Sequence, residues 1–182
     1  MALPVAMTQS KGSADTCVAP AIPLDIQDHL KTNYVSWKVK QPSDFWPLSN
    51  PESEREAWLW FKQRRCPGIA VGGFQPGADT IYAFLLVPAT TRVSGSRLVI
   101  VKRVAGSAIA SQVIAKRPDG EDWPNADYFI RSVKLDPYAG RRWKTSPEMK
   151  EGILIYGAGH GLFFWESGRY VLEFTDEVDR DQ

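Results

Sequence analysis

From Gly68 to the C-terminus, the sequence consists of short apolar stretches separated by turn residues. Each stretch is long enough for one strand, and no helical pattern lies between one stretch and the next. The stretches span residues 69–74, 80–87, 97–104, 108–115, 128–135, 152–156, 162–165 and 169–174. Strands joined by turns rather than by helices favour antiparallel pairing. We therefore expect a mostly antiparallel sheet of about seven or eight strands.

Two of the connections have the composition of hairpin turns. Residues 75–79 read Gln-Pro-Gly-Ala-Asp and join the first two strands. Residues 166–168 read Glu-Ser-Gly and join the last two strands. Pro, Gly, Asp and Ser are residues that tight turns prefer. Each of these two strand pairs is therefore predicted to form a β-hairpin.

Two helices are expected before this β-rich part. The first follows Pro23, with Leu24, Ile26 and Leu30 as its apolar positions. The second spans residues 51–65, where a Ser-Asn pair precedes a proline at the first helical position and acidic residues follow. Basic residues occupy its last turns, and a Pro-Gly pair ends it.

The remaining N-terminal residues complete the expected organisation. Residues 34–39 alternate loosely between polar and apolar side chains, as a short edge strand does. Residues 1–21 are expected to form an extended or mobile arm, and residues 22–182 a single β-rich domain. The predicted fold class is α+β, dominated by β, with the two N-terminal helices covering an open edge or end of the sheet.

The composition is that of a soluble globular chain. Of the 182 residues, 43% are hydrophobic and 24% are charged, which argues against disorder. The formal net charge of +1 argues against nucleic acid as a partner, because phosphate binding needs a concentrated basic field. No apolar run approaches the roughly 20 residues that a spanning helix needs, so no membrane span is expected.

The N-terminus favours an exported protein. Residues 1–21 have neither the basic start nor the continuous apolar core of a signal peptide. Their small and polar residues are typical instead of a mature N-terminus that carries an added initiator Met after its signal peptide was removed. We therefore expect a periplasmic or otherwise exported protein.

The two cysteines, Cys17 and Cys66, offer a single cross-link. A disulfide between them would tie the N-terminal arm to the end of the helix at 51–65. Such a bond closes a loop of about 50 residues and stabilises a fold by a few kcal/mol. The alternative is two free thiols in a reducing cytosol. The sequence favours the disulfide, in keeping with export.

Recognisable catalytic motifs are absent, and no catalytic residue, metal site or cofactor is expected. Cys66 is predicted at the C-terminal end of a helix, where the helix dipole disfavours the thiolate that a nucleophile needs. His160 lies in a Gly-Ala-Gly-His-Gly segment typical of a turn or bulge. No Cys-x-x-Cys, His-Glu-x-x-His or His-x-His spacing indicates a metal site. A Cys66–His160 pair or two converging carboxylates stay open as enzyme alternatives.

Two long connections carry the residues expected to bind a partner. Residues 117–127 form an acidic segment with a central Trp, and residues 136–150 form a basic segment with aromatic residues. Loops on a rigid sheet commonly carry recognition, and a large aromatic side chain can anchor a partner. The alternative is that these rings fold back onto the core. The predicted partner-binding residues are Asp119, Glu121, Asp122, Trp123, Tyr138, Arg141, Trp143 and His160.

Two segments carry a family resemblance. Residues 66–74 read Cys-Pro-Gly-Ile-Ala-Val-Gly-Gly-Phe and are followed by Thr-Ile-Tyr-Ala-Phe-Leu-Leu at 80–86. Residues 162–170 read Leu-Phe-Phe-Trp-Glu-Ser-Gly-Arg-Tyr. Both resemble segments of small exported bacterial proteins of unknown function that contain one degenerate FG-GAP or VCBS-like β unit. FG-GAP units bind calcium through an Asp-rich loop, whereas residues 75–79 have one carboxylate, so no calcium site is expected there.

Three classes of function fit these observations. The first is a non-enzymatic exported binding protein, an immunity or inhibitor protein that neutralises a secreted toxin or cell-wall hydrolase through its loops. The second is a carbohydrate- or peptidoglycan-binding module, for which the seven Trp residues would supply stacking rings. The third is an enzyme with an unmarked carboxylate or Cys-His site. The missing catalytic constellation favours the first class.

Overall fold

The computed structural model describes residues 21–41, 44, 66–78, 80–90, 95–104, 108–117, 129–135, 150–156 and 160–175. Within these ranges the chain forms one helix followed by nine strands. The elements are α1 (Leu24–Asn33), β1 (Trp37–Val39), β2 (Ile69–Gly72), β3 (Ile81–Pro88), β4 (Ser96–Arg103), β5 (Ile109–Arg117), β6 (Phe129–Lys134), β7 (Glu151–Tyr156), β8 (His160–Glu166) and β9 (Arg169–Thr175).

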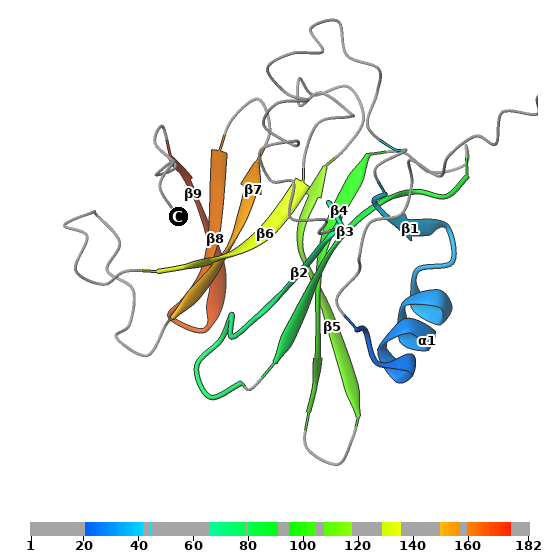
Figure 1. The fold of residues 1–182 in the computed structure, drawn as a ribbon, viewed down its shortest axis with the longest axis horizontal. Coiled ribbons are helices and arrows are strands. Elements are labelled where there is room, and N and C mark those ends of the chain that lie inside the picture. The colour runs from blue at the N-terminus through cyan, green and yellow to red at the C-terminus, as the bar shows by residue number, and fades with distance from the viewer. Residues whose placement is uncertain are drawn as a thin grey trace, which may run out of the picture.

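The strands form two antiparallel sheets (Figure 1). The first sheet has the order β1-β3-β4-β5, with β2 also paired to β3. The second sheet has the order β6-β7-β8-β9, so its four strands are consecutive in sequence and form a meander. Short apolar segments joined by turns favour this kind of neighbour-to-neighbour pairing.

One edge of β3 is shared by two strands. β1 pairs with residues 86–88 of β3, and β2 pairs with residues 81–84. Between them, the Leu85 amide donates to the Gly68 carbonyl oxygen and the Leu85 carbonyl accepts from the Lys40 amide, each at 2.9 Å. Because β1 and β2 both run antiparallel to β3, they follow one another along the same edge. Together they resemble one strand that is interrupted between Lys40 and Gly68.

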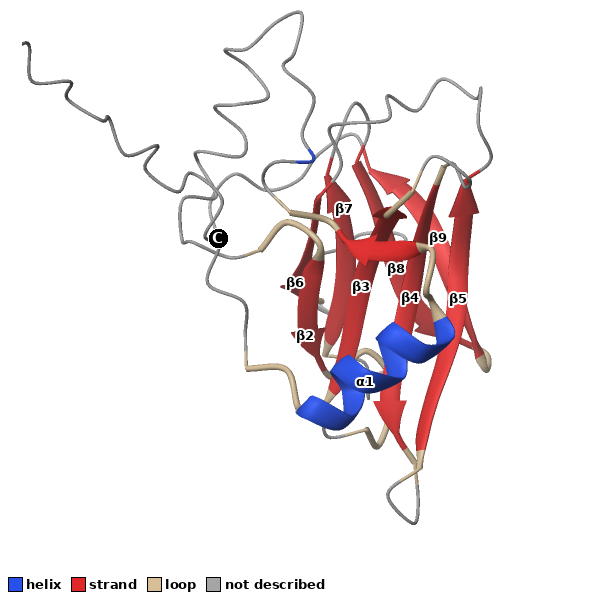
Figure 2. Cartoon of the chain, turned by 90° about the vertical axis from the view of Figure 1, so that its right-hand side faces the viewer, coloured by secondary structure: helices blue, strands red, loops and turns tan. Residues whose placement is uncertain are grey.

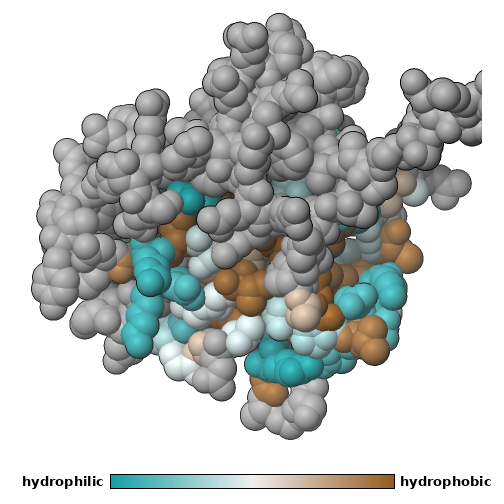
Figure 3. Space-filling view, viewed as in Figure 1, coloured by the Kyte–Doolittle hydropathy of each residue, from teal (hydrophilic) through white to brown (hydrophobic). Residues whose placement is uncertain are grey.

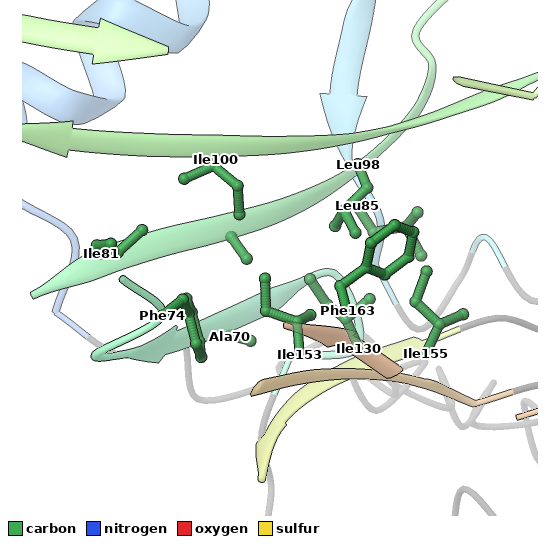
Figure 4. Close-up of a cluster of buried hydrophobic side chains, with 11 residues drawn as sticks. Ala70, Phe74, Ile81, Leu85, Leu98, Ile100, Ile130, Ile153, Ile155 and Phe163 are labelled. Atoms are coloured by element: carbon green, nitrogen blue, oxygen red, sulfur yellow. The ribbon is translucent and has the colours of Figure 1, made fainter. Parts of the chain in front are cut away.

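The main hydrophobic core lies between the two sheets (Figure 4). Alternate residues of each strand point into it, as the two-residue period of a strand requires. Its buried residues are Ala70, Phe74, Ile81, Ala83, Leu85, Leu98, Ile100, Ile130, Ile153, Ile155 and Phe163. Since both sheets contribute one apolar face each, burial of that surface holds them together as a sandwich.

The other face of the first sheet is covered by α1, which lies across β3, β4 and β5 (Figure 2). Ile26 of the helix is fully buried. It belongs to a second cluster with Cys66, Ile69, Phe84, Leu86, Val99 and Val101. This sheet is therefore buried on both faces, which explains why residues 98–101 form a continuous apolar run rather than an alternating one. The molecule has three layers, in the order helix, first sheet, second sheet.

Hydrogen bonds join the two sheets along the edge where β2 meets β6. The Ile130 amide donates to the Pro67 carbonyl oxygen at 2.8 Å. At the other end of β2, the amide of Gly73 donates to Oε2 of Glu151 at 2.5 Å, and Glu151 belongs to β7. These bonds fix the second sheet in position relative to the start and end of β2.

Both predicted hairpins are present. β2 and β3 pair antiparallel, and the turn before β3 is closed by a hydrogen bond from the Ala78 amide to the Gln75 carbonyl oxygen at 3.3 Å. β8 and β9 pair from Glu166 opposite Arg169 onward, so only two residues form their turn. The short helix predicted after Pro23 is α1, and the edge strand predicted at 34–39 is β1.

The sequence prediction of the fold is confirmed in part. The β-dominated α+β class and the antiparallel pairing are confirmed. The single sheet of about seven or eight strands is wrong, because the described residues form nine strands in two sheets that bury their apolar faces against each other. Two N-terminal helices are not confirmed, since the described ranges contain only α1 and residues 51–65 lie outside them. The predicted arm at 1–21 also lies outside them, apart from Ala21.

Within the described ranges, no helix has the length and apolar character required to cross a membrane.

Candidate functional site

Seven of the eight predicted partner-binding residues lie outside the described residues. These are Asp119, Glu121, Asp122, Trp123, Tyr138, Arg141 and Trp143. The eighth, His160, is the first residue of β8, and its backbone lies opposite Thr175 of β9. For these residues, the structure shows to which strand ends their segments are attached.

The two segments are attached at opposite ends of β6 (Figure 1). Phe129, the first residue of β6, lies opposite Tyr156, the last residue of β7. Residues 118–128 therefore enter the second sheet at the end where residues 157–159 lead to His160. Lys134 lies opposite Glu151 at the other end, where residues 136–149 are attached. Six residues of strand separate the two ends by about 20 Å.

The predicted binding residues thus fall into two sets. The first set consists of the acidic segment with Trp123, and His160 belongs to the same end of the sheet. The second set consists of Tyr138, Arg141 and Trp143, whose segment is attached at the end that also holds the β8–β9 turn. The sequence alone did not separate them, because the pairing of β6 with β7 decides which connections share an end.

Cys66 does not supply a reactive thiol. It is 2% exposed and disulfide-bonded, directly before the turn that leads into β2. Cys17 is the other cysteine of the sequence and lies outside the described residues, so the Cys17–Cys66 pairing stays a prediction. A cysteine without a free thiol cannot act as a nucleophile. In this state the alternative of a Cys66–His160 catalytic pair has no nucleophile.

A serine and a histidine lie together where α1 covers β5. Nε2 of His29 is 2.9 Å from Oγ of Ser111, and the Tyr34 hydroxyl donates to the same Oγ at 3.1 Å. Nδ2 of Asn33 is 3.3 Å from Nδ1 of His29 and donates to the His29 carbonyl oxygen at 2.9 Å. The sequence prediction missed this cluster, because His29 and Ser111 are 82 positions apart and belong to no spacing motif.

The hydrogen bonds of this cluster assign the wrong imidazole tautomer for nucleophilic catalysis. The amide nitrogen of Asn33 is a donor, so Nδ1 of His29 is the acceptor and Nε2 carries the proton. Nε2–H then donates to Ser111, whose Oγ also accepts from Tyr34. A general base needs an unprotonated Nε2 facing the serine, as it has when a carboxylate holds Nδ1–H. The cluster therefore fastens the helix to the sheet and does not activate Ser111.

A second polar group lies between the sheets, at the end of the sandwich that holds the β8–β9 turn. Gln75 is 8% exposed, and its Oε1 accepts a hydrogen bond from Nζ of Lys102 at 2.6 Å. The ring of Tyr170 packs against the main core and lies edge-on to Trp165, with the ring centroids 5.0 Å apart. Burial raises the pKa of Tyr170, while a nearby Gln75 side chain opposes part of that rise. The phenol is therefore neutral at physiological pH.

The Tyr170 hydroxyl makes no well-formed hydrogen bond to another described residue, although it is buried. An unbonded phenol that is kept protonated by burial is a weak acid and a poor base. Its ring, by contrast, contacts Trp165 and the core from the β9 side. The geometry assigns Tyr170 a packing role at this end of the sandwich.

The two described Trp residues both have aromatic or cationic neighbours. Trp165 contacts Tyr170, and the Arg97 guanidinium lies over the Trp37 ring, 4.3 Å from its centroid. On the face shown in Figure 3, hydrophobic and hydrophilic side chains of the described residues alternate in small patches. A ring that stacks on a sugar needs an accessible face. Arg97 covers one face of the Trp37 ring, so that face is not accessible to a sugar.

Two of the described carboxylates, Asp25 and Glu151, have partners that hold them in place. Asp25 of α1 receives hydrogen bonds from Nε and Nη2 of Arg103 at 2.9–3.0 Å. These bonds lower the pKa of Asp25, so it stays ionised at neutral pH. Glu151 accepts from the Gly73 amide. Among the described residues, no group of three or more His, Cys, Asp or Glu side chains is arranged to hold a metal ion.

No protein-family model, curated protein or solved structure matches the chain. The resemblance to FG-GAP or VCBS-like units therefore stays a prediction. The turn at which that family binds calcium is described here only up to Ala78, and Asp79, the one carboxylate expected in it, lies outside the described residues.

Proposed function

We propose that this chain is an exported, non-enzymatic binding protein that neutralises a secreted toxin or cell-wall hydrolase. The proposed binding surface consists of residues 119–123 together with His160. The observation that carries this proposal is the pairing of Phe129 with Tyr156, because it attaches the acidic segment and the segment before His160 to neighbouring strand ends. Loops that share one end of a rigid sheet are a common arrangement for recognition.

The proposed surface suits a basic partner. Asp119, Glu121 and Asp122 give residues 119–123 three carboxylates next to Trp123. Carboxylates around an aromatic anchor steer a positively charged surface and fix its orientation, while the ring supplies most of the buried contact area. A toxin or hydrolase with a basic active-site face is therefore the class of partner that we propose.

The scaffold supports an exported location. Cys66 is disulfide-bonded, and disulfides persist mainly in oxidising compartments. The second sheet is fastened to the first by the Pro67–Ile130 and Gly73–Glu151 hydrogen bonds, so the strand ends that hold the proposed surface are fixed relative to the core. A fixed scaffold lowers the entropic cost of ordering binding loops.

The test is a binding measurement with a defined partner. Secreted hydrolase or toxin domains encoded by genes that neighbour this one would be sought, purified and titrated by calorimetry with the wild-type chain, Trp123→Ala and Trp143→Ala. We expect Trp123→Ala to raise Kd by at least about tenfold, because a buried aromatic anchor carries much of the binding energy. Trp143→Ala is the matched control, since its segment is attached at the opposite end of β6, and its Kd should stay within about twofold.

Two outcomes would contradict the proposal. One is that the chain binds purified peptidoglycan and no protein partner, which would support the carbohydrate-binding class instead. The other is that Trp143→Ala weakens binding while Trp123→Ala does not, which would move the surface to the opposite end of the second sheet. Circular dichroism of each variant would show that the fold is unchanged.

A further inference from the structure

We propose that the outer edge of β9 binds β9 of a second copy of this chain, so that two second sheets join into one. β9 is the last strand in the order β6-β7-β8-β9 and pairs with β8 over its full length, from Arg169 to Thr175. Its register contains no shift. Among the described residues, no strand pairs with its other edge. A long, regular edge strand is a template for a further strand.

The other sheet edges in the described part carry features that discourage strand addition. β5, the last strand of the first sheet, contains a register shift between Leu98 and Val99 of its partner β4, and Lys116 and Arg117 stand at its end. β1 has only three residues. β6 meets the segment before β2 through the Pro67–Ile130 hydrogen bond. Bulges, lysines and short length all protect edges, and β9 has none of them.

The β8–β9 turn determines which backbone groups of β9 face outward. Ser167 and Gly168 both have positive φ, at 50° and 85°, as a type I′ turn requires. In such a hairpin the flanking pair, here Glu166 and Arg169, is hydrogen-bonded across the strands. Bonding then alternates along the strand. The N–H and C=O groups of Tyr170, Leu172 and Phe174 therefore point away from β8, toward the open edge.

The side chains of β9 are complementary to themselves in one antiparallel register. When Val171 lies opposite Val171 of the second copy, Arg169 of each copy lies opposite Glu173 of the other. Shifting the register by two residues in either direction removes both charge pairs. Arg169 is exposed and Glu173 is half-buried, and neither forms an ion pair with another described residue. Opposite charges directly across a strand pair stabilise it.

The same register also supplies backbone bonds and apolar contacts. Tyr170 lies opposite Leu172 of the second copy, and both belong to the outward-facing, hydrogen-bonding positions. Phe174 lies opposite Gly168 of the second copy. Phe174 is 63% exposed, and nothing lies within 4 Å of where a Cβ of Gly168 would be. An aromatic ring across from a strand-end glycine covers the space that the glycine leaves open.

The occupant is therefore a second copy of this chain, related by a two-fold axis through Val171. A two-fold axis places the same patch on both sides of the interface, so each favourable pair occurs twice. The joined sheet would have the order β6-β7-β8-β9-β9-β8-β7-β6. This interface uses neither residues 119–123 nor His160, so the dimer and the proposed binding surface can be tested independently.

The experiment uses charge reversal in the full chain, with the molar mass measured by light scattering or sedimentation up to about 100 μM. The wild type should reach the mass of a dimer. Arg169→Glu places Glu opposite Glu, and Glu173→Arg places Arg opposite Arg, so each variant alone should raise the dimer Kd by at least about tenfold. An equal mixture of the two variants restores both opposite-charge pairs and should recover a dimer.

Lys116→Glu, at the end of the β5 edge, is the matched control and should leave the mass unchanged. Recovery of a dimer in the mixture also shows that both variants are folded. A wild type that stays monomeric over the whole concentration range overturns the proposal. So does a dimer that persists unchanged in both single variants, or a mixture that fails to associate while circular dichroism shows both variants folded.

Discussion

A methyl group added at Gly68 would have no space. An added Cβ would lie 2.7 Å from the Lys40 carbonyl oxygen and 2.8 Å from the Lys40 amide nitrogen. This backbone cannot easily move away. The Lys40 amide donates a hydrogen bond to the Leu85 carbonyl oxygen of β3, and Lys40 is 2% exposed. The glycine is therefore required by the close approach of two chain segments, rather than by its flexibility.

We predict that Gly68→Ala lowers the free energy of unfolding by about 2 kcal/mol or more, since backbone at this point must move to accommodate the added carbon. Gly73→Ala is the matched control, because an added Cβ there would have its nearest neighbour at 3.6 Å. Its cost should stay below about 1 kcal/mol. Urea unfolding of the two variants beside wild type measures both values. Equal losses at the two positions would contradict the proposed close approach.

Single residues also show what the sequence could not reveal. Leu24, Ile26 and Leu30 were recognisable as the apolar positions of a helix because they lie within a few residues of one another. The contact between His29 and Ser111 was not, because each residue alone resembles an ordinary polar surface residue and the fold brings them together across 82 positions. Likewise, nothing local to Gly68 indicates that the Lys40 backbone lies against it.

At the scale of elements, α1 is held on the first sheet by contacts of different kinds. Ile26 is fully buried in the cluster between the helix and the sheet. The Asp25–Arg103 ion pair joins the first turn of the helix to the last residue of β4. His29 and Tyr34 reach Ser111 of β5. Burial of Ile26 supplies the larger stabilisation, and the polar contacts fix where along the sheet the helix lies.

The Asp25–Arg103 pair makes the stability of this contact depend on pH. Hydrogen bonds from Arg103 lower the pKa of Asp25 from its ordinary value of 3.8. A carboxyl group whose pKa is lower in the folded state contributes stability above its unfolded pKa and loses it as the pH falls through the folded value. We therefore predict that the difference in unfolding midpoint between wild type and Asp25→Asn is constant near neutral pH and shrinks as the pH falls below about 4.

Thermal unfolding of both proteins at a series of pH values measures this difference. Asp28→Asn is a suitable comparison, because Asp28 lies on the same helix and pairs only with Lys31 of that helix. It should shift the midpoint less than Asp25→Asn at neutral pH. A wild-type advantage over Asp25→Asn that grows toward acid would show that the ion pair is not formed.

The positions of the strands were largely predictable, whereas their grouping was not. Each strand is bounded by turn residues, so its place in the sequence follows from local composition. Residues 98–101 form an unbroken apolar run, which a strand buried on both faces requires, but the run does not show what covers each face. The division into two sheets depends on how β5 and β6 separate, and no local pattern in either strand encodes it.

At the scale of the whole molecule, three layers are joined by few covalent constraints besides the chain itself. With two cysteines in the sequence, the disulfide of Cys66 is the one cross-link that the chain can form within itself. If Cys17 is its partner, as the sequence predicts, the bond closes a loop of about 50 residues and should contribute about 4 kcal/mol to the free energy of unfolding. Reduction of this disulfide should therefore lower the free energy of unfolding by an amount that urea unfolding can measure.

We predict that alkylation without reductant leaves the intact mass of the denatured chain unchanged, and that alkylation after reduction adds two groups. Peptide mapping of the unreduced protein should recover residues 17 and 66 in one linked fragment. Reduction should lower the urea concentration at the midpoint of unfolding, and it changes the mass of the chain only by the hydrogens added to the two sulfurs. Two alkylated cysteines in the unreduced sample would remove both the cross-link and its support for an exported location.

Because β1 and β2 meet end to end at Leu85, the chain between residues 41 and 67 leaves the sheet and returns to it at one point. Because this connecting segment begins and ends at the same place on β3, it does not have to span a fixed distance, and the fold sets no minimum for its length. The entropic cost of closing a loop rises by only roughly 0.6 kcal/mol for each doubling of its length. The junction of Lys40 and Gly68 can therefore accommodate a connecting segment of different length while the strands on either side keep their register on β3.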